Sequence, residues 1–164
     1  MSTPVGQAGI KTSTGVALSG VSNSAAVGYG HNCEVETDGT IKCWGYNANG
    51  QLGNGTTISN PTPLTVSGIT NAVKVFVASA DGVAASTYGR TCALLSDATV
   101  KCWGDLGSSG NATSAIAIGS LANVTDFSLS PMLNNTSTDG FYCAVISGGT
   151  VKCGGANSYG QLGD

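Results

Sequence analysis

The chain has 164 residues, a net charge of −3 and only 9% Asp, Glu, Lys and Arg, where an average soluble protein has about 25%. Its 41% hydrophobic content excludes ordinary disorder, its six basic residues form no stripe for nucleic acid, and no apolar run is long enough to span a membrane. Abundant Gly, Val and Thr with few strong helix formers predict one all-β domain over residues 1–164.

The first residues of the chain do not look like a secretory signal. Residues 1–5 contain neither a basic start nor the beginning of an apolar segment. A start further upstream, a processed precursor and export by another route are all compatible with this sequence.

Six cysteines form the strongest pattern in the sequence. They fall into three pairs with nine residues between the members of each pair. The pairs are Cys33 and Cys43, Cys92 and Cys102, and Cys143 and Cys153. Each intervening segment reads as a short strand, a turn signal and another short strand, so each pair is predicted to bracket a β-hairpin.

A three-residue loop fits the tip of each hairpin. The loops are residues 37–39, 96–98 and 147–149. Such a loop has a type I turn followed by a residue in the left-handed region, which Gly adopts at low cost. Gly39 and Gly149 occupy this position, whereas Ala98 is a costly exception.

Counting back from these loops gives the register of the hairpins. Val35 faces Ile41 and Cys33 faces Cys43 in a non-hydrogen-bonded pair, with Cα atoms about 4.5 Å apart. A disulfide tolerates that distance, and the other two cysteine pairs follow by the same count. We therefore predict three disulfides, each adding about 2–3 kcal/mol to stability, and an oxidising compartment.

Two other interpretations of the cysteines are weaker. Six free buried thiols would not explain why three pairs share one register. Zinc sites use closely spaced cysteines and often histidine, but here nine residues separate the members of a pair and His31 is the only histidine. We therefore expect no metal site on the cysteines.

The hairpins also alternate between apolar and charged positions. We expect the cysteine-bearing face to be buried and the opposite face to be solvated. The apolar pairs on the cysteine face are Val35 with Ile41, Leu94 with Val100, and Val145 with Val151. The opposite face carries Lys42, Lys101 and Lys152, with Glu34 across from Lys42. Glu34 and Glu36 are predicted to be solvated.

The hairpins are part of a longer internal repeat. Cys43-Trp44-Gly45 is followed by Asn-Ala-Asn-Gly-Gln-Leu-Gly at residues 47–53, and a similar run returns at residues 157–163. A degraded copy, Gly-Gln-Ala-Gly, stands at residues 6–9. Leu-Ser-Gly-Val at residues 18–21 echoes Val-Ser-Gly-Ile at residues 66–69. Repeats of this length decide architecture.

Residues 33–56 resemble the repeat of the regulator of chromosome condensation family, in the disulfide-bearing form of bacterial secreted members. The resemblance extends with departures over nearly the whole chain. It implies four-stranded, antiparallel β-propeller blades, about three of them, in repeat units of roughly residues 6–50, 51–105 and 106–164. It does not imply the nucleotide exchange or chromatin binding of the founding member, which is a basic eukaryotic protein.

The repeats depart from the family pattern at several places. His31 precedes the first hairpin, but Arg90 and Phe141 take its position in the others. Gly154 replaces the Trp of the third repeat, and the turn of the second repeat shrinks at residues 105–110.

Two loops are longer than in the first repeat, near residues 79–88 and 130–139. Binding residues concentrate on loops over a rigid scaffold; neutral drift of loop length explains the insertions equally well. The candidate binding or assembly residues on these loops are Ser79, Asp81, Tyr88, Leu133, Asn134 and Asp139.

No catalytic constellation is visible. His31 is expected to make a structural hydrogen bond beside the hairpin, and no cofactor motif is present. Four aspartates are interpreted as turn residues, with calcium binding as a weaker alternative: Asp38, Asp97, Asp139 and Asp164. Candidate glycosylation sequons begin at Asn54, Asn111, Asn123, Asn134 and Asn135.

Three blades do not close a propeller, which needs roughly four to eight. The chain is therefore predicted either to self-associate as a ring or filament or to be a segment of a longer propeller. We expect a non-enzymatic extracellular structural protein on a cell or particle surface. A secreted binder of glycan or protein, or a protein inhibitor, is the alternative. The low charge favours a surface covered by other copies, further blades or sugars.

Overall fold

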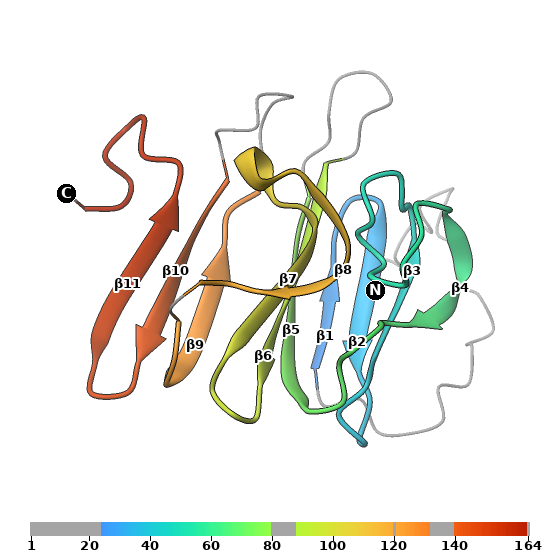
Figure 1. The fold of residues 1–164 in the computed structure, drawn as a ribbon, viewed down its shortest axis with the longest axis horizontal. Coiled ribbons are helices and arrows are strands. Elements are labelled where there is room, and N and C mark those ends of the chain that lie inside the picture. The colour runs from blue at the N-terminus through green and yellow to red at the C-terminus, as the bar shows by residue number, and fades with distance from the viewer. Residues whose placement is uncertain (1–23, 80–87, 120, 132–139, 164) are drawn as a thin grey trace, which may run out of the picture.

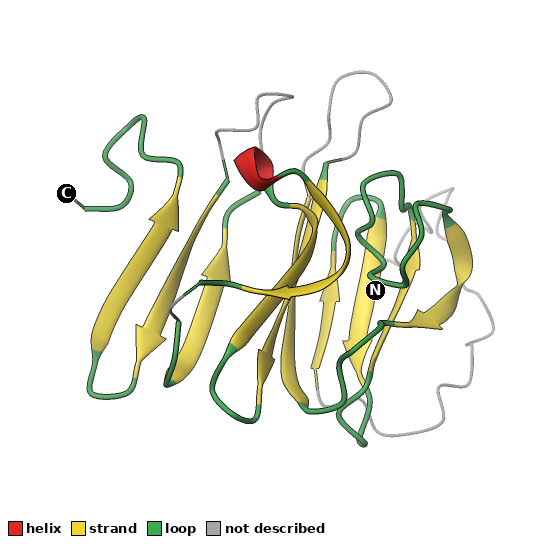
Figure 2. Cartoon of the chain, viewed as in Figure 1, coloured by secondary structure: helices red, strands yellow, loops and turns green. Residues whose placement is uncertain are grey.

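The computed structural model describes residues 24–79, 88–119, 121–131 and 140–163. In these ranges, eleven strands form three antiparallel sheets that stand side by side (Figures 1 and 2). We call these sheets blades 1, 2 and 3 in chain order. Their arrangement confirms the predicted all-β fold of propeller-type blades. Among the described residues, no helix is long and apolar enough to cross a membrane.

Each blade is a meander of consecutive strands. Blade 1 contains β1 (Ser24–Val27), β2 (His31–Val35), β3 (Ile41–Gly45) and β4 (Asn60–Thr65). Blade 2 contains β5 (Ala72–Ser79), β6 (Gly89–Leu95), β7 (Val100–Asp105) and β8 (Asn111–Ala117), with a 3₁₀ turn η1 (Gly107–Ser109) before β8. Blade 3 contains β9 (Val124–Leu129), β10 (Phe141–Ile146) and β11 (Thr150–Gly155). Within the described ranges it has three strands, one fewer than its neighbours.

The cysteine pairs lie in the predicted register. Each cysteine faces its partner directly across the central hairpin of its blade. The Cα–Cα distances are 4.1 Å for Cys33 and Cys43, 4.0 Å for Cys92 and Cys102, and 4.1 Å for Cys143 and Cys153. All six cysteines are in disulfides, which confirms the predicted pairing.

The hairpin tips also follow the prediction. Gly39 and Gly149 have φ angles of 79° and 87°, and Ala98 holds the same left-handed conformation with a φ of 61°. Asp38 accepts hydrogen bonds from the backbone and hydroxyl of Thr40. Asp97 and Thr99 repeat this pattern, so the two described turn aspartates act as predicted; Asp139 and Asp164 lie outside the described residues.

Two apolar cores hold the blades together, one at each junction. At each junction the cysteine face of one blade packs against the opposite face of the next blade. Val35, Ile41, Leu94 and Val100 are therefore buried, as predicted. The corresponding pair of blade 3 differs: Val145 is 37% and Val151 is 59% exposed. Nothing in the described part of the chain stacks on that face.

The prediction for Glu34 and Glu36 was wrong, because both side chains are buried. Glu36 forms a 2.7 Å ion pair with Lys42, which stands opposite Glu34 in the register. Burial raises the pKa of Glu34, and the nearby charge of Glu36 raises it further, while Lys42 acts in the opposite direction. Alternation correctly placed these residues on one face, but it could not show that this face is covered.

Candidate interaction surface

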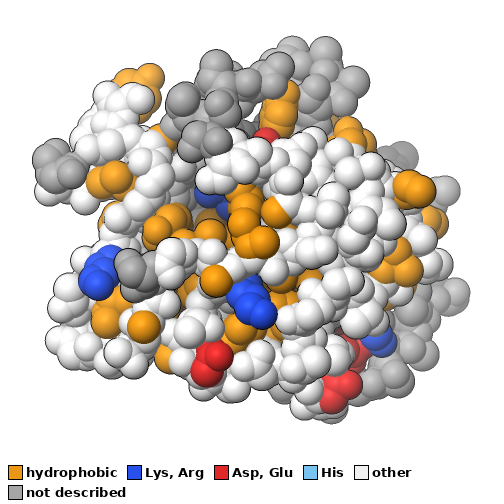
Figure 3. All heavy atoms as spheres, viewed as in Figure 1, with side chains coloured by type: hydrophobic (Ala, Val, Ile, Leu, Met, Phe, Trp, Pro, Cys, Tyr) orange, Lys and Arg blue, Asp and Glu red, His pale blue; other side chains and the backbone are white. Residues whose placement is uncertain are grey.

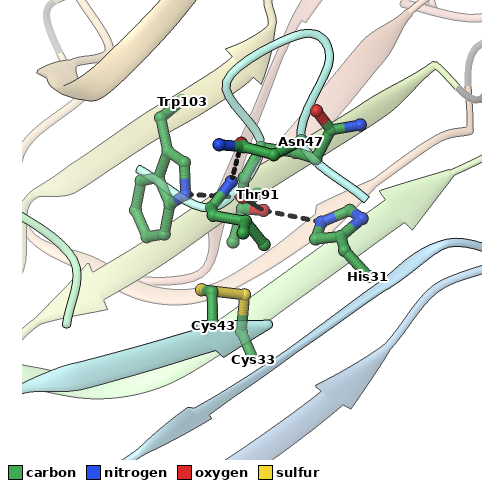
Figure 4. The surroundings of a disulfide bond; sticks show 8 residues. His31, Cys33, Cys43, Asn47, Thr91 and Trp103 are labelled. Carbon is green, nitrogen blue, oxygen red and sulfur yellow. Dashed lines mark hydrogen bonds between the residues drawn. A yellow bond between two sulfur atoms is a disulfide. The ribbon is translucent and has the colours of Figure 1, made fainter. Parts of the chain in front are cut away.

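The junction between blades 1 and 2 is closed by a buried polar network (Figure 4). His31, at the start of β2, lies with its Nε2 2.9 Å from Oγ1 of Thr91 on β6. Thr91 donates from Oγ1 to the carbonyl oxygen of Gln51 at 3.0 Å, and the indole nitrogen of Trp103 donates to the same oxygen at 3.0 Å. Because Thr91 uses its only proton on Gln51, the His31 ring must donate from Nε2.

This environment keeps His31 uncharged. Its side chain is buried, and burial lowers its pKa from 6.5 to about 4. A neutral imidazole that donates one hydrogen bond across a blade junction is a structural element. The prediction of a structural hydrogen bond for His31 is confirmed.

Gln51 is held by the loop between β3 and β4 of blade 1. Asn47, fully buried, accepts a 2.8 Å bond from the Leu52 amide on Oδ1 and donates from Nδ2 to the carbonyls of Thr56 and Ile58. The loop thereby presents Gln51 and the buried Leu52 to blade 2. We call residues 47–53 the first clamp loop. The repeated letters of this loop are visible in the sequence, but its role at the blade junction was not predicted from them.

The junction between blades 2 and 3 is less completely filled. A cavity of about 580 Å³ lies there, lined in part by Arg90, Leu106, Ile116 and Tyr142. Arg90, at the position of His31, donates from Nε to the Asp105 carbonyl oxygen at 3.0 Å. Burial lowers the pKa of Arg90, and the charge of Asp105 partly opposes this effect.

One substitution and one shortened loop account for this difference between the junctions. Gly154 stands where blade 2 has Trp103, and a Cβ there would lie 2.6 Å from the hydroxyl oxygen of Tyr142. The Tyr142 ring stacks on Phe127 with centroids 5.5 Å apart. In blade 2, the loop that corresponds to the first clamp loop is the short η1 turn, which has no Gly-Gln-Leu-Gly sequence. Figure 3 shows hydrophobic side chains with few charged groups on the face that includes blades 2 and 3.

The loop after blade 3 repeats the geometry of the first clamp loop. Asn157 Oδ1 accepts from the Leu162 amide at 2.9 Å. Gln161 Oε1 accepts from the Tyr159 amide at 2.9 Å, as Gln51 Oε1 accepts from the Asn49 amide at 2.8 Å. We call residues 157–163 the second clamp loop. Tyr159 is 94% exposed and Leu162 is half-buried, so this loop is formed although no described blade packs on it.

The outer edge of β11 also differs from its counterparts. In blade 1 the Val66 amide donates to the Ile41 carbonyl at 2.8 Å, and in blade 2 the Ile118 amide donates to the Val100 carbonyl at 3.0 Å. Within the described residues β11 pairs only with β10. We define the open face of blade 3 as Val145, Val151, the outer edge of β11 and the second clamp loop.

The predicted binding residues on the long loops are only partly described. Ser79 ends β5, and its hydroxyl accepts a hydrogen bond from the Tyr29 amide of blade 1. Tyr88 is half-buried just before β6. The remaining four predicted residues lie outside the described part of the chain: Asp81, Leu133, Asn134 and Asp139. The structure thus places Ser79 in a contact between blades, and a binding role for these loops stays a prediction.

Three of the five sequons are described. Asn54 is half-buried, and its Oδ1 accepts from the amide and hydroxyl of Thr56. Asn111 is exposed and donates to Asn49, and Asn123 is exposed with a φ of 57°. Asn134 and Asn135 lie outside the described ranges. Glycosylation stays a prediction for all five. In the described ranges, His, Cys, Asp and Glu form no group of three that could hold a metal.

Comparisons with known proteins agree with this architecture. Consecutive antiparallel four-stranded or three-stranded sheets that pack face to face define a repeat protein of the β-propeller type. Two family models, both described as the regulator of chromosome condensation (RCC1) repeat, match residues 24–51 and residues 38–85. Residues 24–85 therefore match models of the RCC1 repeat, which confirms the resemblance predicted from the cysteine hairpins.

Solved structures show the same fold. Human WBSCR16 matches with a TM-score of 0.63 and 15% identity, over 84% of this chain and 34% of that one. Yeast RCC1 (Prp20), in a structure bound to Kap60, matches with a TM-score of 0.57 and 19% identity, over 85% and 33%. Prp20p from Saccharomyces cerevisiae, in a structure reported with its binding to Gsp1p and histones, matches with a TM-score of 0.56 and 17% identity, over 85% and 33%. The chain spans about a third of the length of these proteins.

Proposed function

We propose that this chain is a non-enzymatic, extracellular interaction protein that self-associates through the open face of blade 3. The observation that carries the proposal is the open face itself. It combines a strand edge that is unpaired within the described ranges, exposed Val145 and Val151, and a formed clamp loop. Unpaired edges and exposed apolar patches are typical of surfaces that bind another chain. The low charge of the chain supports the same proposal, because a solitary small domain usually carries a more charged surface.

A non-enzymatic role is supported by how the reactive residue types are used. The single histidine is neutral and buried in a junction. Arg90 is buried and bonds to a backbone carbonyl, and Asp38 and Asp97 bond within their own turns. These groups contribute to the blades and their junctions.

An extracellular location is supported by the three disulfides, which persist in oxidising environments. We place the assembled protein on the surface of a cell or particle, as a ring or a filament. The yeast neighbour is reported with protein partners, namely Kap60, Gsp1p and histones. A protein partner, here a second copy of the same chain, is consistent with this fold.

The experiment is a measurement of the native particle. Light scattering after size exclusion gives the mass, and electron microscopy of native material distinguishes a ring from a filament. We expect particles several times heavier than the 16.2 kDa chain. A discrete monomer at micromolar concentration would overturn self-association.

Two specific observations favour alternatives. The cavity of about 580 Å³ between blades 2 and 3, with Arg90 and Tyr142 on its wall, favours a secreted binder of glycan or protein, or an inhibitor. The coverage of about a third of the neighbours' length favours a segment of a longer propeller. Ligand screening on the monomer tests the first alternative, and the mass of the native polypeptide tests the second.

A further inference from the structure

We propose that the Cys143–Cys153 disulfide is a site of reversible thiolation, at which an external thiol attacks Sγ of Cys153. The six cysteines form three bridges, and this is the bridge whose sulfur atoms a thiol can reach in the folded protein. The reaction itself does not require self-association. Its effect on assembly rests on the proposed function of the open face.

The three bridges are alike in their covalent and local structure. Each joins cysteines with a sequence separation of 10, and the Cα–Cα distances lie between 4.0 and 4.1 Å. A lysine precedes the second cysteine of each hairpin, namely Lys42, Lys101 and Lys152. A neighbouring ammonium favours the thiolate form, and each bridge has one. A difference in reactivity between the bridges must therefore come from access to their sulfur atoms.

Burial distinguishes the bridge of blade 3 from the other two. The four cysteines of blades 1 and 2 are at most 2% exposed, because the following blade packs over each of these bridges. Cys143 and Cys153 are half-buried, and Val145 and Val151 on the same face are exposed. Exchange requires a thiolate to contact a sulfur atom. The first two bridges can therefore react only when their blades open, whereas the third can react in the native state.

The order of the strands selects the sulfur atom that is attacked. A thiolate approaches a disulfide along the line of the sulfur–sulfur bond, opposite the sulfur that leaves. Cys143 lies on β10, between β9 and β11, and Ser128 of β9 stands opposite it. Cys153 lies on β11, which within the described ranges pairs only with β10. The line to Sγ of Cys153 therefore comes over the outer edge of the sheet, whereas the line to Sγ of Cys143 passes over β9.

The exchange balances with two external thiols. The first thiolate forms a bond to Sγ of Cys153, the Cys143–Cys153 bond breaks, and its electron pair leaves on Sγ of Cys143, which takes a proton from water. If the Cys143 thiolate attacks Sγ of Cys153 instead, it expels the external thiol and restores the bridge. A second external thiol that attacks the added sulfur releases the disulfide of the two external thiols and leaves Cys153 as a thiol. The external thiols are then oxidised and the bridge is reduced.

Thiolation changes the open face of blade 3. An adduct on Cys153 stands between Val151 and Gly155 on β11, and the covalent link between β11 and β10 is lost. Val151 is 59% exposed, so the adduct covers part of the apolar surface through which we propose that copies associate. We therefore expect thiolated chains not to assemble, and assembled chains to be protected from thiols.

Peptide mapping of the wild-type chain tests the site. Dilute native protein is mixed with excess reduced glutathione, quenched with acid at successive times and alkylated with N-ethylmaleimide, and mass spectrometry then assigns the state of each cysteine. We expect the first glutathione adduct on Cys153 and the first alkylated thiol on Cys143. These products should form at least about a hundredfold faster than products of the other two bridges, because buried bridges react only after local opening.

Two controls separate access from intrinsic reactivity. In denaturant the three bridges are expected to react at similar rates, since their loop lengths match. The double variant Cys143→Ser with Cys153→Ser is expected to give no early adduct. Equal rates for all three bridges in the native protein, or a preference for the blade 3 bridge that persists in denaturant, would overturn the proposal. A first adduct on Cys143 would overturn the attack over the edge of β11.

The same reaction at concentrations at which the wild type assembles tests the effect on assembly. We expect thiolation of Cys153 to slow, and analytical ultracentrifugation to show that assemblies disappear as thiolation proceeds. An unchanged rate in assemblies would overturn the open face as the contact between copies but leave the thiolation site standing. A chain that is monomeric at every concentration and still reacts first at Cys153 would overturn self-association alone.

Discussion

His31 is the only histidine in the chain and allows a direct test of the junction between blades 1 and 2. Burial lowers its pKa from 6.5 to about 4 in the folded protein. In the unfolded chain the imidazole has its ordinary pKa near 6.5. Between these values the unfolded state binds a proton that the folded state rejects, so acid favours unfolding.

The two pKa values give the magnitude. Their difference corresponds to about 3 kcal/mol, since one pKa unit is about 1.36 kcal/mol. The contribution of His31 to the free energy of unfolding is expected to be fully present at pH 7, to decrease as the pH falls below about 6.5, and to level off below about 4. This is a large share of the 5–15 kcal/mol by which typical domains are stable.

The assay compares the wild type with His31→Gln across this pH range. Glutamine can donate to Thr91 Oγ1 but does not titrate, so it is a matched control. Chemical unfolding from pH 7 to pH 4 gives the free energy of unfolding of both proteins. Subtracting one value from the other removes the contribution of the carboxylates, which both proteins share. The nuclear magnetic resonance signal of the lone imidazole reports its folded pKa directly. Parallel pH profiles, or an imidazole that titrates near 6.5 in the folded protein, would refute this account.

Three further predictions concern the turns, the bridges and the buried carboxylates. Ala98→Gly is expected to raise the free energy of unfolding by about 1 kcal/mol, since φ is 61° there; an unchanged thermal midpoint contradicts this. Joint replacement of Cys143 and Cys153 by serine should lower the free energy of unfolding by about 2–3 kcal/mol. Reductant should then lower the thermal midpoint of this variant further, because it opens the two remaining disulfides. If reductant has no effect on the wild type, that result would count against the disulfides. Burial and the charge of Glu36 raise the pKa of Glu34, so its ionisation in the folded protein is costly only at higher pH. Glu34→Gln should therefore stabilise the protein at pH 7 and have little effect below about pH 4. Equal stabilisation at both pH values in chemical unfolding would contradict this.

The sequence predicts local structure well where one residue type permits few conformations. Cysteine spacing determined the register of three hairpins, since a two-stranded ladder with a fixed loop leaves one pairing for each bridge. The same count identified Ala98 as a left-handed residue, and its φ is 61°. These inferences use contacts between residues that are close in the chain.

Contacts between blades were harder to predict. Glu34 lies on the face that alternation indicated, but its burial depends on packing around the sheet, which period-two patterning does not report. Val151 has the same local pattern as Ile41 and Val100, yet it is exposed because no described blade follows. The polar network around the Gln51 carbonyl joins residues up to 60 positions apart, and the repeated Gly-Gln-Leu-Gly letters were its only signal.

The two tryptophans and the two complete clamp loops follow one pattern along the repeat. A buried indole N–H needs an acceptor, and Trp103 obtains it from the first clamp loop. Blade 3 follows the shortened loop and has Gly154 in place of tryptophan, so the loss of the clamp and the loss of the indole occur at the same junction. The second clamp loop has kept its sequence and geometry, and Trp44 is the other tryptophan of the chain. The substitutions are therefore matched along the repeat: the junction that lacks a complete clamp loop also lacks the indole that such a loop would accept.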